Sequence, residues 1–213
     1  MDSKVRDRSK NELIARKNEF LKICKILDIL KINYFLTSGI LLGAVRDNDF
    51  IKWDWDIELS VFANDFYPNI DLISNKLQES NFKIDKIIRD KDNSKIDFIG
   101  SYSKEVTNYT IYAYKYSRIR DVYWRKELTI PSKYLNKLSK LNFLGRQFNC
   151  PLYINEYLTF VYGDWKKPLR TSNKKVYLSK NYKKKTFFLT IYIEKFLMKI
   201  YGYIMMIKKL MKL

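Results

Sequence analysis

Histidine is absent from this chain, and its absence removes several kinds of active site. The 213 residues contain no His, which excludes a Ser-His-Asp triad, a histidine general base and His-ligated zinc. The two cysteines, Cys24 and Cys150, are not spaced as a metal knuckle or a redox pair. Cys24 falls in an amphipathic stretch, which predicts a buried free thiol. So few cysteines in a chain of this length favour a reducing, cytoplasmic setting.

Glycine and proline are also scarce, at six and four residues. No stretch rich in either divides the first part of the chain, so we expect residues 1–170 to form one α/β (α+β) domain. The apolar fraction of 46% is sufficient for a sizeable core. The first ten residues contain no apolar run of the signal-peptide kind, which again points to the cytoplasm.

Acidic residues are outnumbered by basic ones. The chain has 41 Lys and Arg against 23 Asp and Glu, a net charge of +18. Residues 166–185 include nine of the basic residues and no acid, and we expect 171–186 to be a basic linker. Basic runs bind anions, including nucleic acid, anionic lipid and phosphorylated substrates. A nucleic-acid-binding protein is therefore an alternative, although no recognised nucleic-acid motif is present.

Long uninterrupted apolar runs are missing too. In residues 187–213 the apolar side chains fall on one face of a helical wheel and the lysines mostly on the other. Lysines interrupt this segment, so a membrane span of ~20 residues is not expected. The pattern predicts a basic amphipathic helix that lies on an anionic membrane surface. The alternative is a terminal helix packed on the domain or on a partner subunit.

Among the few acids, three stand at alternate positions in one apolar stretch: Asp54, Asp56 and Glu58. In a strand they would share one face, with Trp55, Ile57, Leu59 and Val61 on the other. A row of like charges costs free energy. A divalent cation compensates such a row, and carboxylate oxygens suit a hard ion such as Mg²⁺, or Mn²⁺ in its place. The alternative is a solvated strand face with ordinary surface acids.

A turn upstream of these acids predicts a phosphate site. A short apolar strand is followed by Ser38-Gly39 and a helix-like run that ends at Arg46. The free N–H groups at a helix N-terminus suit a phosphate, whereas a plain turn is the alternative. Arg46 is a further phosphate candidate, because a guanidinium matches phosphate oxygens; its other candidate partner is Asp54.

The remaining pattern alternates helices with strands. Apolar spacing predicts helices over 11–31, 40–46, 65–80 and 154–161, and strands over 34–37, 55–61, 82–88, 95–99 and 109–116. A hairpin is expected where 141–144 and 147–150 flank Gly145-Arg146.

Several of these segments together resemble the LicD and fukutin-related family, which has the nucleotidyltransferase fold. The resemblance rests on GILLGAVR at 39–46, WDWDIE at 53–58 and, far downstream, YGDWKKP at 162–168. Residues 143–145 and 155–158 are similar to the family's hairpin and following helix. One position departs from the family pattern: the last acid of the row is Glu58, where the family usually has Asp.

The resemblance implies a mixed sheet flanked by helices and a transferase activity. Such an enzyme moves a phospho-substituent, of the phosphocholine or phospho-polyol type, from a CDP-linked donor to a hydroxyl of a glycan or lipid-linked glycan. It implies that Asp54, Asp56 and Glu58 serve metal binding and catalysis. Ser38, Gly39 and Arg46 would then bind phosphate.

Other roles stay open. The fold generally uses a further acid on a later strand, and Asp97 is the best placed, unless it only forms the polar face of an edge strand. Glu58 is the other candidate base, which would leave Asp54 and Asp56 on the metal. Asp164 either closes the site or caps a turn, and we favour the turn. A catalytically degenerate family member that binds a partner is the remaining alternative.

Overall fold

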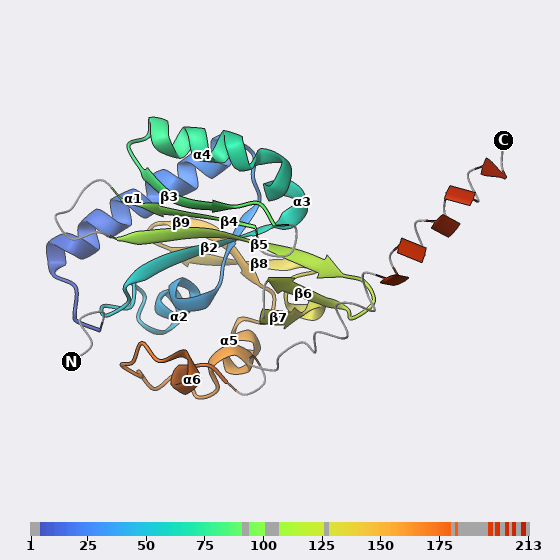
Figure 1. The fold of residues 1–213 in the computed structure, drawn as a ribbon. Helices are drawn as coiled ribbons and strands as arrows, with labels where there is room; N and C mark the ends of the chain where they lie inside the picture. The colour runs from blue at the N-terminus through green and yellow to red at the C-terminus, as the bar shows by residue number, and fades with distance from the viewer. Residues whose placement is uncertain are drawn as a thin grey trace.

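The computed structural model describes residues 5–90, 94–100, 107–125, 128–179 and 182, and part of the C-terminal segment (196–197, 199–200, 203–204, 206–207 and 210–211). A mixed seven-stranded sheet forms its centre (Figure 1). The strand order is β1 (Tyr34–Leu36), β2 (Asp56–Phe62), β5 (Asn108–Ser117), β4 (Lys95–Ile99) and β3 (Lys83–Ile88). From β5 the sheet continues into β6 (Val122–Arg125) and β7 (Leu128–Pro131).

One pair of neighbouring strands in this sheet is parallel, and the other pairs are antiparallel. β2 and β5 run parallel, whereas β1–β2, β4–β5, β3–β4, β5–β6 and β6–β7 are antiparallel. β8 (Leu138–Phe143) and β9 (Arg146–Pro151) form a separate two-stranded sheet, and β9 packs against β1 through Phe148 and Tyr34. The predicted α/β fold, a mixed sheet flanked by helices, is confirmed.

Helices cover both faces of the sheet (Figure 1). α1 (Lys10–Ile29) and α4 (Ile70–Glu79) lie on one side, and α2 (Ser38–Arg46), α5 (Ile154–Tyr162) and α6 (Lys174–Tyr177) on the other. α3 (Ala63–Phe66) and two short 3₁₀ helices, Tyr67–Asn69 and Ser132–Tyr134, connect neighbouring elements.

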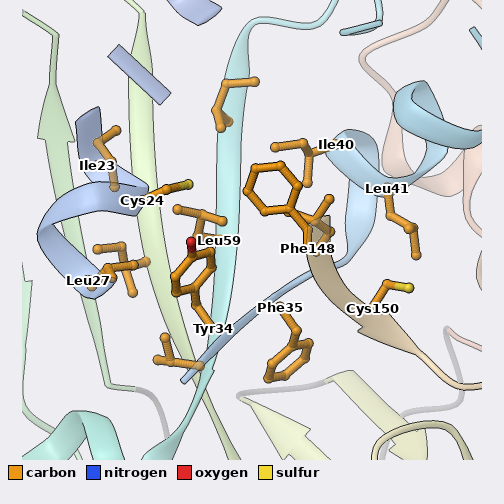
Figure 2. Close-up of a cluster of buried hydrophobic side chains, with 14 of the residues drawn as sticks. Ile23, Cys24, Leu27, Tyr34, Phe35, Ile40, Leu41, Leu59, Phe148 and Cys150 are labelled. Atoms are coloured by element: carbon orange, nitrogen blue, oxygen red, sulfur yellow. The ribbon is translucent and has the colours of Figure 1, made fainter. Parts of the chain in front are cut away.

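α1 begins at a capping box. The side chain of Ser9 accepts a hydrogen bond from the backbone N–H of Glu12, and the Glu12 carboxylate accepts one from the N–H of Ser9. The buried face of this helix then packs on β2. Figure 2 shows Leu59 beside Cys24, Leu27 and Tyr34. The predicted burial of Cys24 as a free thiol is observed.

The structure differs from the sequence prediction in two places. The hairpin turns at Leu144-Gly145, where both residues have positive φ (50° and 80°), and β9 already begins at Arg146. Two consecutive positive φ values are the geometry of the tight turn that matches the twist of paired strands. The second difference is β6 and β7, which the sequence pattern did not predict.

The C-terminal segment is described at ten positions between 196 and 211. Nine of these, up to Leu210, are helical, and the side chains described there are exposed. The rest of the helix predicted over 187–213 lies outside the described residues. None of the helices formed by described residues is both long and apolar enough to cross a membrane.

Candidate functional site

A cleft of about 560 Å³ opens on the sheet face that carries Asp56 and Glu58. Its walls come from α2, the segment before β2, strands β2 to β7, α5 and the residues that follow α5. The cleft is lined by six residues that the sequence singled out together: Ser38, Gly39, Arg46, Asp54, Asp56 and Glu58.

The row of acids is only partly a strand. β2 begins at Asp56, so Asp56 and Glu58 share a face while Ile57 and Leu59 are buried on the other. Asp54 precedes the strand, as does Trp55. Trp55 was expected on the opposite face, but it lines the cleft, because side-chain alternation does not hold before the strand begins.

Asp54 lies directly against the first turn of α2. A Cβ atom built on Gly39 would come within 2.4 Å of Asp54 Oδ2. The other carboxylate oxygen, Oδ1, accepts a hydrogen bond of 3.0 Å from the N–H of Trp55. The glycine therefore admits the carboxylate to the helix N-terminus, where free N–H groups and the helix dipole favour negative charge.

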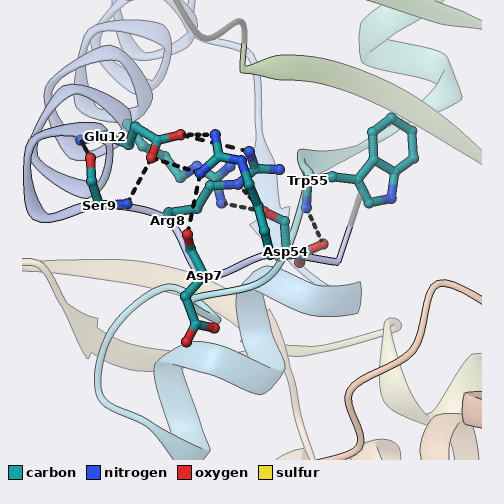
Figure 3. A network of polar contacts seen from close by, with 8 residues as sticks. Asp7, Arg8, Ser9, Glu12, Asp54 and Trp55 are labelled. Carbon is teal, nitrogen blue, oxygen red and sulfur yellow. Dashed lines mark hydrogen bonds and ion pairs between the residues drawn. The ribbon is translucent and has the colours of Figure 1, made fainter. Parts of the chain in front are cut away.

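Two arginines hold the backbone under this carboxylate. Arg16 Nη1 and Arg8 Nε donate to the carbonyl oxygen of Asp54, at 3.0 and 3.2 Å, and Figure 3 shows Arg8 and Asp54 within this polar network. Arg16 is buried, at 2% exposure. The N-terminal part of α1 therefore fixes the segment that carries the first acid.

Burial shifts the pKa values of Asp54 and Arg16. It raises the pKa of Asp54 to about 6, while the Arg16 charge acts to lower it and the Glu58 charge to raise it. Burial also lowers the pKa of Arg16, with Asp54 acting in the opposite direction. The site thus has an electrostatic cost that a bound cation would relieve.

Arg125, at the end of β6, also lines the cleft. Its Nη2 lies 3.3 Å from Glu58 Oε2, and its Nε donates to the Tyr114 hydroxyl at 3.0 Å. Its guanidinium lies 3.6 Å from the ring centroid of Tyr112. Burial acts to lower the pKa of Arg125, but Tyr114 and Glu58 outweigh it and the pKa is raised.

Two residues predicted for the site, Asp97 and Arg46, form their polar contacts with neighbouring residues. Asp97 shares a row of the sheet with Glu58, separated by Thr110. It accepts a hydrogen bond from Thr110 at 2.8 Å, forms an ion pair with Lys95 and does not line the cleft. Arg46 lines the cleft but forms its two hydrogen bonds, each 2.8 Å, with the adjacent Asp47.

The segment predicted as a linker contributes to the cleft. Thr171, Ser172, Tyr177, Leu178 and Tyr182 all line it. The Ser179 N–H donates to the Val161 carbonyl at 2.8 Å, which ties the segment to α5. Burial, followed by the charges of Glu58, Asp56 and Asp54, raises the pKa of Tyr177. Its hydroxyl is therefore near the acids.

The motif at 162–168 also contributes to the cleft. Asp164 lines it, is exposed and pairs with Lys167 at 3.0 Å. It follows Gly163, which ends α5 at a positive φ of 73°. These contacts agree with the turn role favoured for Asp164.

The acids provide the oxygen ligands that Mg²⁺ requires. Across the residues that the structure describes, no group of three or more Asp, Glu, Cys or His is placed so that it could hold a metal ion by itself. Mg²⁺, however, is commonly held by one or two carboxylates together with substrate phosphates. Asp54, Asp56 and Glu58 in one cleft fit a site of that kind.

Comparisons with known proteins identify the family of this chain. The family model described as "LicD/FKTN/FKRP, nucleotidyltransferase domain" matches residues 31–152, more than half of the chain. The human and mouse proteins named "Ribitol 5-phosphate transferase FKRP" are 24% and 23% identical over 145 residues. Each alignment covers 65% of this chain but only 29% of the relative, so the chain corresponds to less than a third of those proteins.

Among solved structures, two of the antibiotic-resistance factor ANT(2'')-Ia match with a TM-score of 0.45 and 13% identity. The solution structure aligns over 65% of this chain and 66% of that one; the crystal structure with adenylyl-2''-tobramycin aligns over 68% and 75%. The assignment rests on the family model: this chain belongs to the LicD/FKTN/FKRP family, with a nucleotidyltransferase domain over residues 31–152.

Proposed function

We propose that this cleft transfers a phospho-substituent, of the phosphocholine or phospho-polyol type, from a CDP-linked donor to a glycan hydroxyl. The observation that carries the proposal is the meeting of Asp54, Asp56 and Glu58 with the N-terminus of α2 in one cleft. This arrangement combines ligands for a hard cation with N–H donors for a phosphate.

In this proposal Asp54 and Asp56 hold Mg²⁺, or Mn²⁺ in its place. When bound there, the metal would supply positive charge to the diphosphate and to the leaving CMP. The backbone at Ser38-Gly39 binds a donor phosphate, and Arg46 at the end of α2 adds positive charge to the same wall.

Glu58 is the favoured base for the acceptor hydroxyl. It lines the cleft, whereas Asp97 is engaged by Thr110 and Lys95 outside the lining. A general base must come within hydrogen-bond reach of the proton that it removes. Glu58 meets this requirement for a substrate bound in the cleft, and Asp97 remains the alternative.

The proposed setting is the cytoplasmic membrane surface, in synthesis of a surface polysaccharide or glycoconjugate. The described part of the C-terminal segment presents exposed apolar side chains on a helix, among them Phe196, Ile200 and Leu210. Together with the lysines of 187–213, these suit an anionic lipid surface. A lipid-linked glycan acceptor would be available there.

The test is a panel of CDP-linked donors, including CDP-choline, CDP-ribitol and CDP-glycerol. We expect at least one to release CMP when Mg²⁺ and a glycan acceptor are present, and chelation by EDTA to stop the release. Mass spectrometry detects the CMP. If the folded protein released none from any donor, the degenerate, partner-binding alternative would be favoured.

Asp56→Ala supplies the specific comparison. Loss of one ligand removes charge stabilisation of several kcal/mol, so turnover should fall by about 100-fold or more. Asp85→Ala is the matched control, because Asp85 is exposed on β3 and lies outside the cleft. Near-normal turnover in Asp56→Ala would show that the metal assignment is wrong.

A further inference from the structure

Arg125 is a buried cation at the cleft that no motif of the sequence identified. It is 8% exposed and lines the cleft at the end of β6. Neighbouring groups fix its position: its guanidinium lies over the ring of Tyr112, and its Nε donates to the hydroxyl of Tyr114. A buried guanidinium held in this way keeps a defined orientation before any ligand arrives.

The hydrogen bond of Arg125 to Glu58 is longer than its hydrogen bond to Tyr114. The Nη2–Oε2 distance is 3.3 Å, longer than the 2.7–2.9 Å usual for a charge-assisted hydrogen bond. A guanidinium has five N–H donors, and the hydrogen bonds to Glu58 and Tyr114 use Nη2 and Nε. A phosphate presents oxygen atoms in the geometry that such a fork matches, and it binds with two parallel hydrogen bonds.

We propose that Arg125 binds a phosphate of the donor, exchanging its contact with Glu58 for one with the phosphate. This inference rests on the proposed function, because it assigns a ligand to another residue that lines the same cleft. The exchange has a consequence for Glu58. Once Nη2 of Arg125 donates to the phosphate, the carboxylate loses its ion pair and is available to the acceptor hydroxyl.

CDP and cytidine are the probes that separate phosphate binding from binding of the nucleoside. With Mg²⁺ present, Arg125→Gln should weaken CDP binding by about tenfold or more, the usual effect of losing a charged hydrogen bond. Its affinity for cytidine should stay at the wild-type value. Isothermal titration calorimetry on the full chain measures both.

A double-mutant cycle tests the exchange itself. Without Mg²⁺, Glu58→Gln should strengthen CDP binding, because the carboxylate that competes for Arg125 is gone. The gain should disappear when Arg125→Gln is added, whereas simple repulsion between Glu58 and CDP would give the same gain in both backgrounds. The double variant also removes both members of the ion pair, so it leaves no buried charge unpaired.

Arg120→Gln is the matched control. Arg120 lies five residues before Arg125, and its guanidinium is 5.4 Å from the ring centroid of Trp124. It does not line the cleft, so its loss should leave CDP affinity unchanged. Equal CDP affinity in wild type and Arg125→Gln would overturn the inference and leave the proposed function standing. Equal weakening of CDP and cytidine would also overturn it. A wild type that binds no CDP would instead contradict the proposed function.

Discussion

At the scale of single residues, the site depends on how closely Asp54 approaches Gly39. The position of a Cβ at residue 39 falls 2.4 Å from the Asp54 carboxylate, which is the end of a side chain and can move. At Gly43, a Cβ would meet backbone atoms instead, Asp49 O at 2.6 Å and Ile51 N at 2.9 Å. The same substitution therefore has different consequences one helical turn apart.

Gly39→Ala should displace the Asp54 carboxylate and weaken Mn²⁺ binding by about 10- to 100-fold, as misplaced metal ligands do. Thermal stability should change little, because alanine favours the helix and the displaced group is flexible. Calorimetric titration with Mn²⁺ and a melting curve measure the two effects. Unchanged Mn²⁺ affinity would show that Asp54 is not a ligand.

Gly43→Ala is the paired change with the opposite pattern. Its Cβ meets backbone, so it should lower the free energy of unfolding by about 1–3 kcal/mol. Urea denaturation of the metal-free protein measures this loss. A Gly43→Ala protein as stable as wild type would contradict the close packing of α2 on residues 49–51.

The sequence predicted some of these residues and missed others for identifiable reasons. Alternation identified Asp56 and Glu58, because both are in a strand. It misplaced Trp55, which precedes the strand. Arg16 and Arg125 were missed because a basic side chain in an amphipathic pattern ordinarily indicates a solvated face, whereas these two are 2% and 8% exposed. Their partners Asp54 and Glu58 lie 38 and 67 residues away in the sequence.

At the scale of elements, the sheet and its helices followed from local patterns. The strands at 34–36, 56–62, 83–88, 95–99 and 108–117 lie where the sequence is rich in Ile, Phe and Tyr. β6 and β7 were missed because each has only four residues and β6 ends in Arg125. Their pairing with β5 and with each other is a tertiary effect that a short local window does not contain.

The segment after α5 provides the element-scale prediction. Tyr182 is 3% exposed, and its ring centroid lies 5.9 Å from the ring centroid of Phe160. Ending the chain after Arg170 should therefore destabilise the domain, by about 1.5–3 kcal/mol for each large buried side chain that is lost. Ending it after Lys185 keeps Tyr177 and Tyr182 and should preserve the melting temperature. Equal melting temperatures for the two shortened chains would contradict a structural role for residues 171–182.

At the scale of the whole molecule, charge and the C-terminal segment act together. The net charge of +18 includes the nine basic residues of 166–185, which lie just before the predicted amphipathic helix. We expect the full chain to bind vesicles that contain anionic lipid and to bind neutral vesicles more weakly. High salt should weaken the binding only in part, because salt screens charge but not apolar burial.

The chain shortened after Lys185 is the control for vesicle binding. It should stay in the supernatant when vesicles are sedimented, while its circular dichroism keeps the signal of the folded domain. Full vesicle binding by this shortened chain would contradict the role of the C-terminal segment. Tight nucleic-acid binding by the full chain, with no binding to vesicles, would favour the nucleic-acid alternative.

The most direct test of the central claim is the mass of the glycan acceptor after reaction with a CDP-linked donor and Mg²⁺. Transfer of a phospho-substituent adds the mass of the phosphorylated polyol or choline to the acceptor and leaves free CMP. We predict this result, and we predict that Asp56→Ala abolishes it while Asp85→Ala does not. An acceptor that gains the mass of CMP would show nucleotidyl transfer and contradict the account. The account would also be contradicted if the mass of the acceptor stayed unchanged with every donor that the cleft binds.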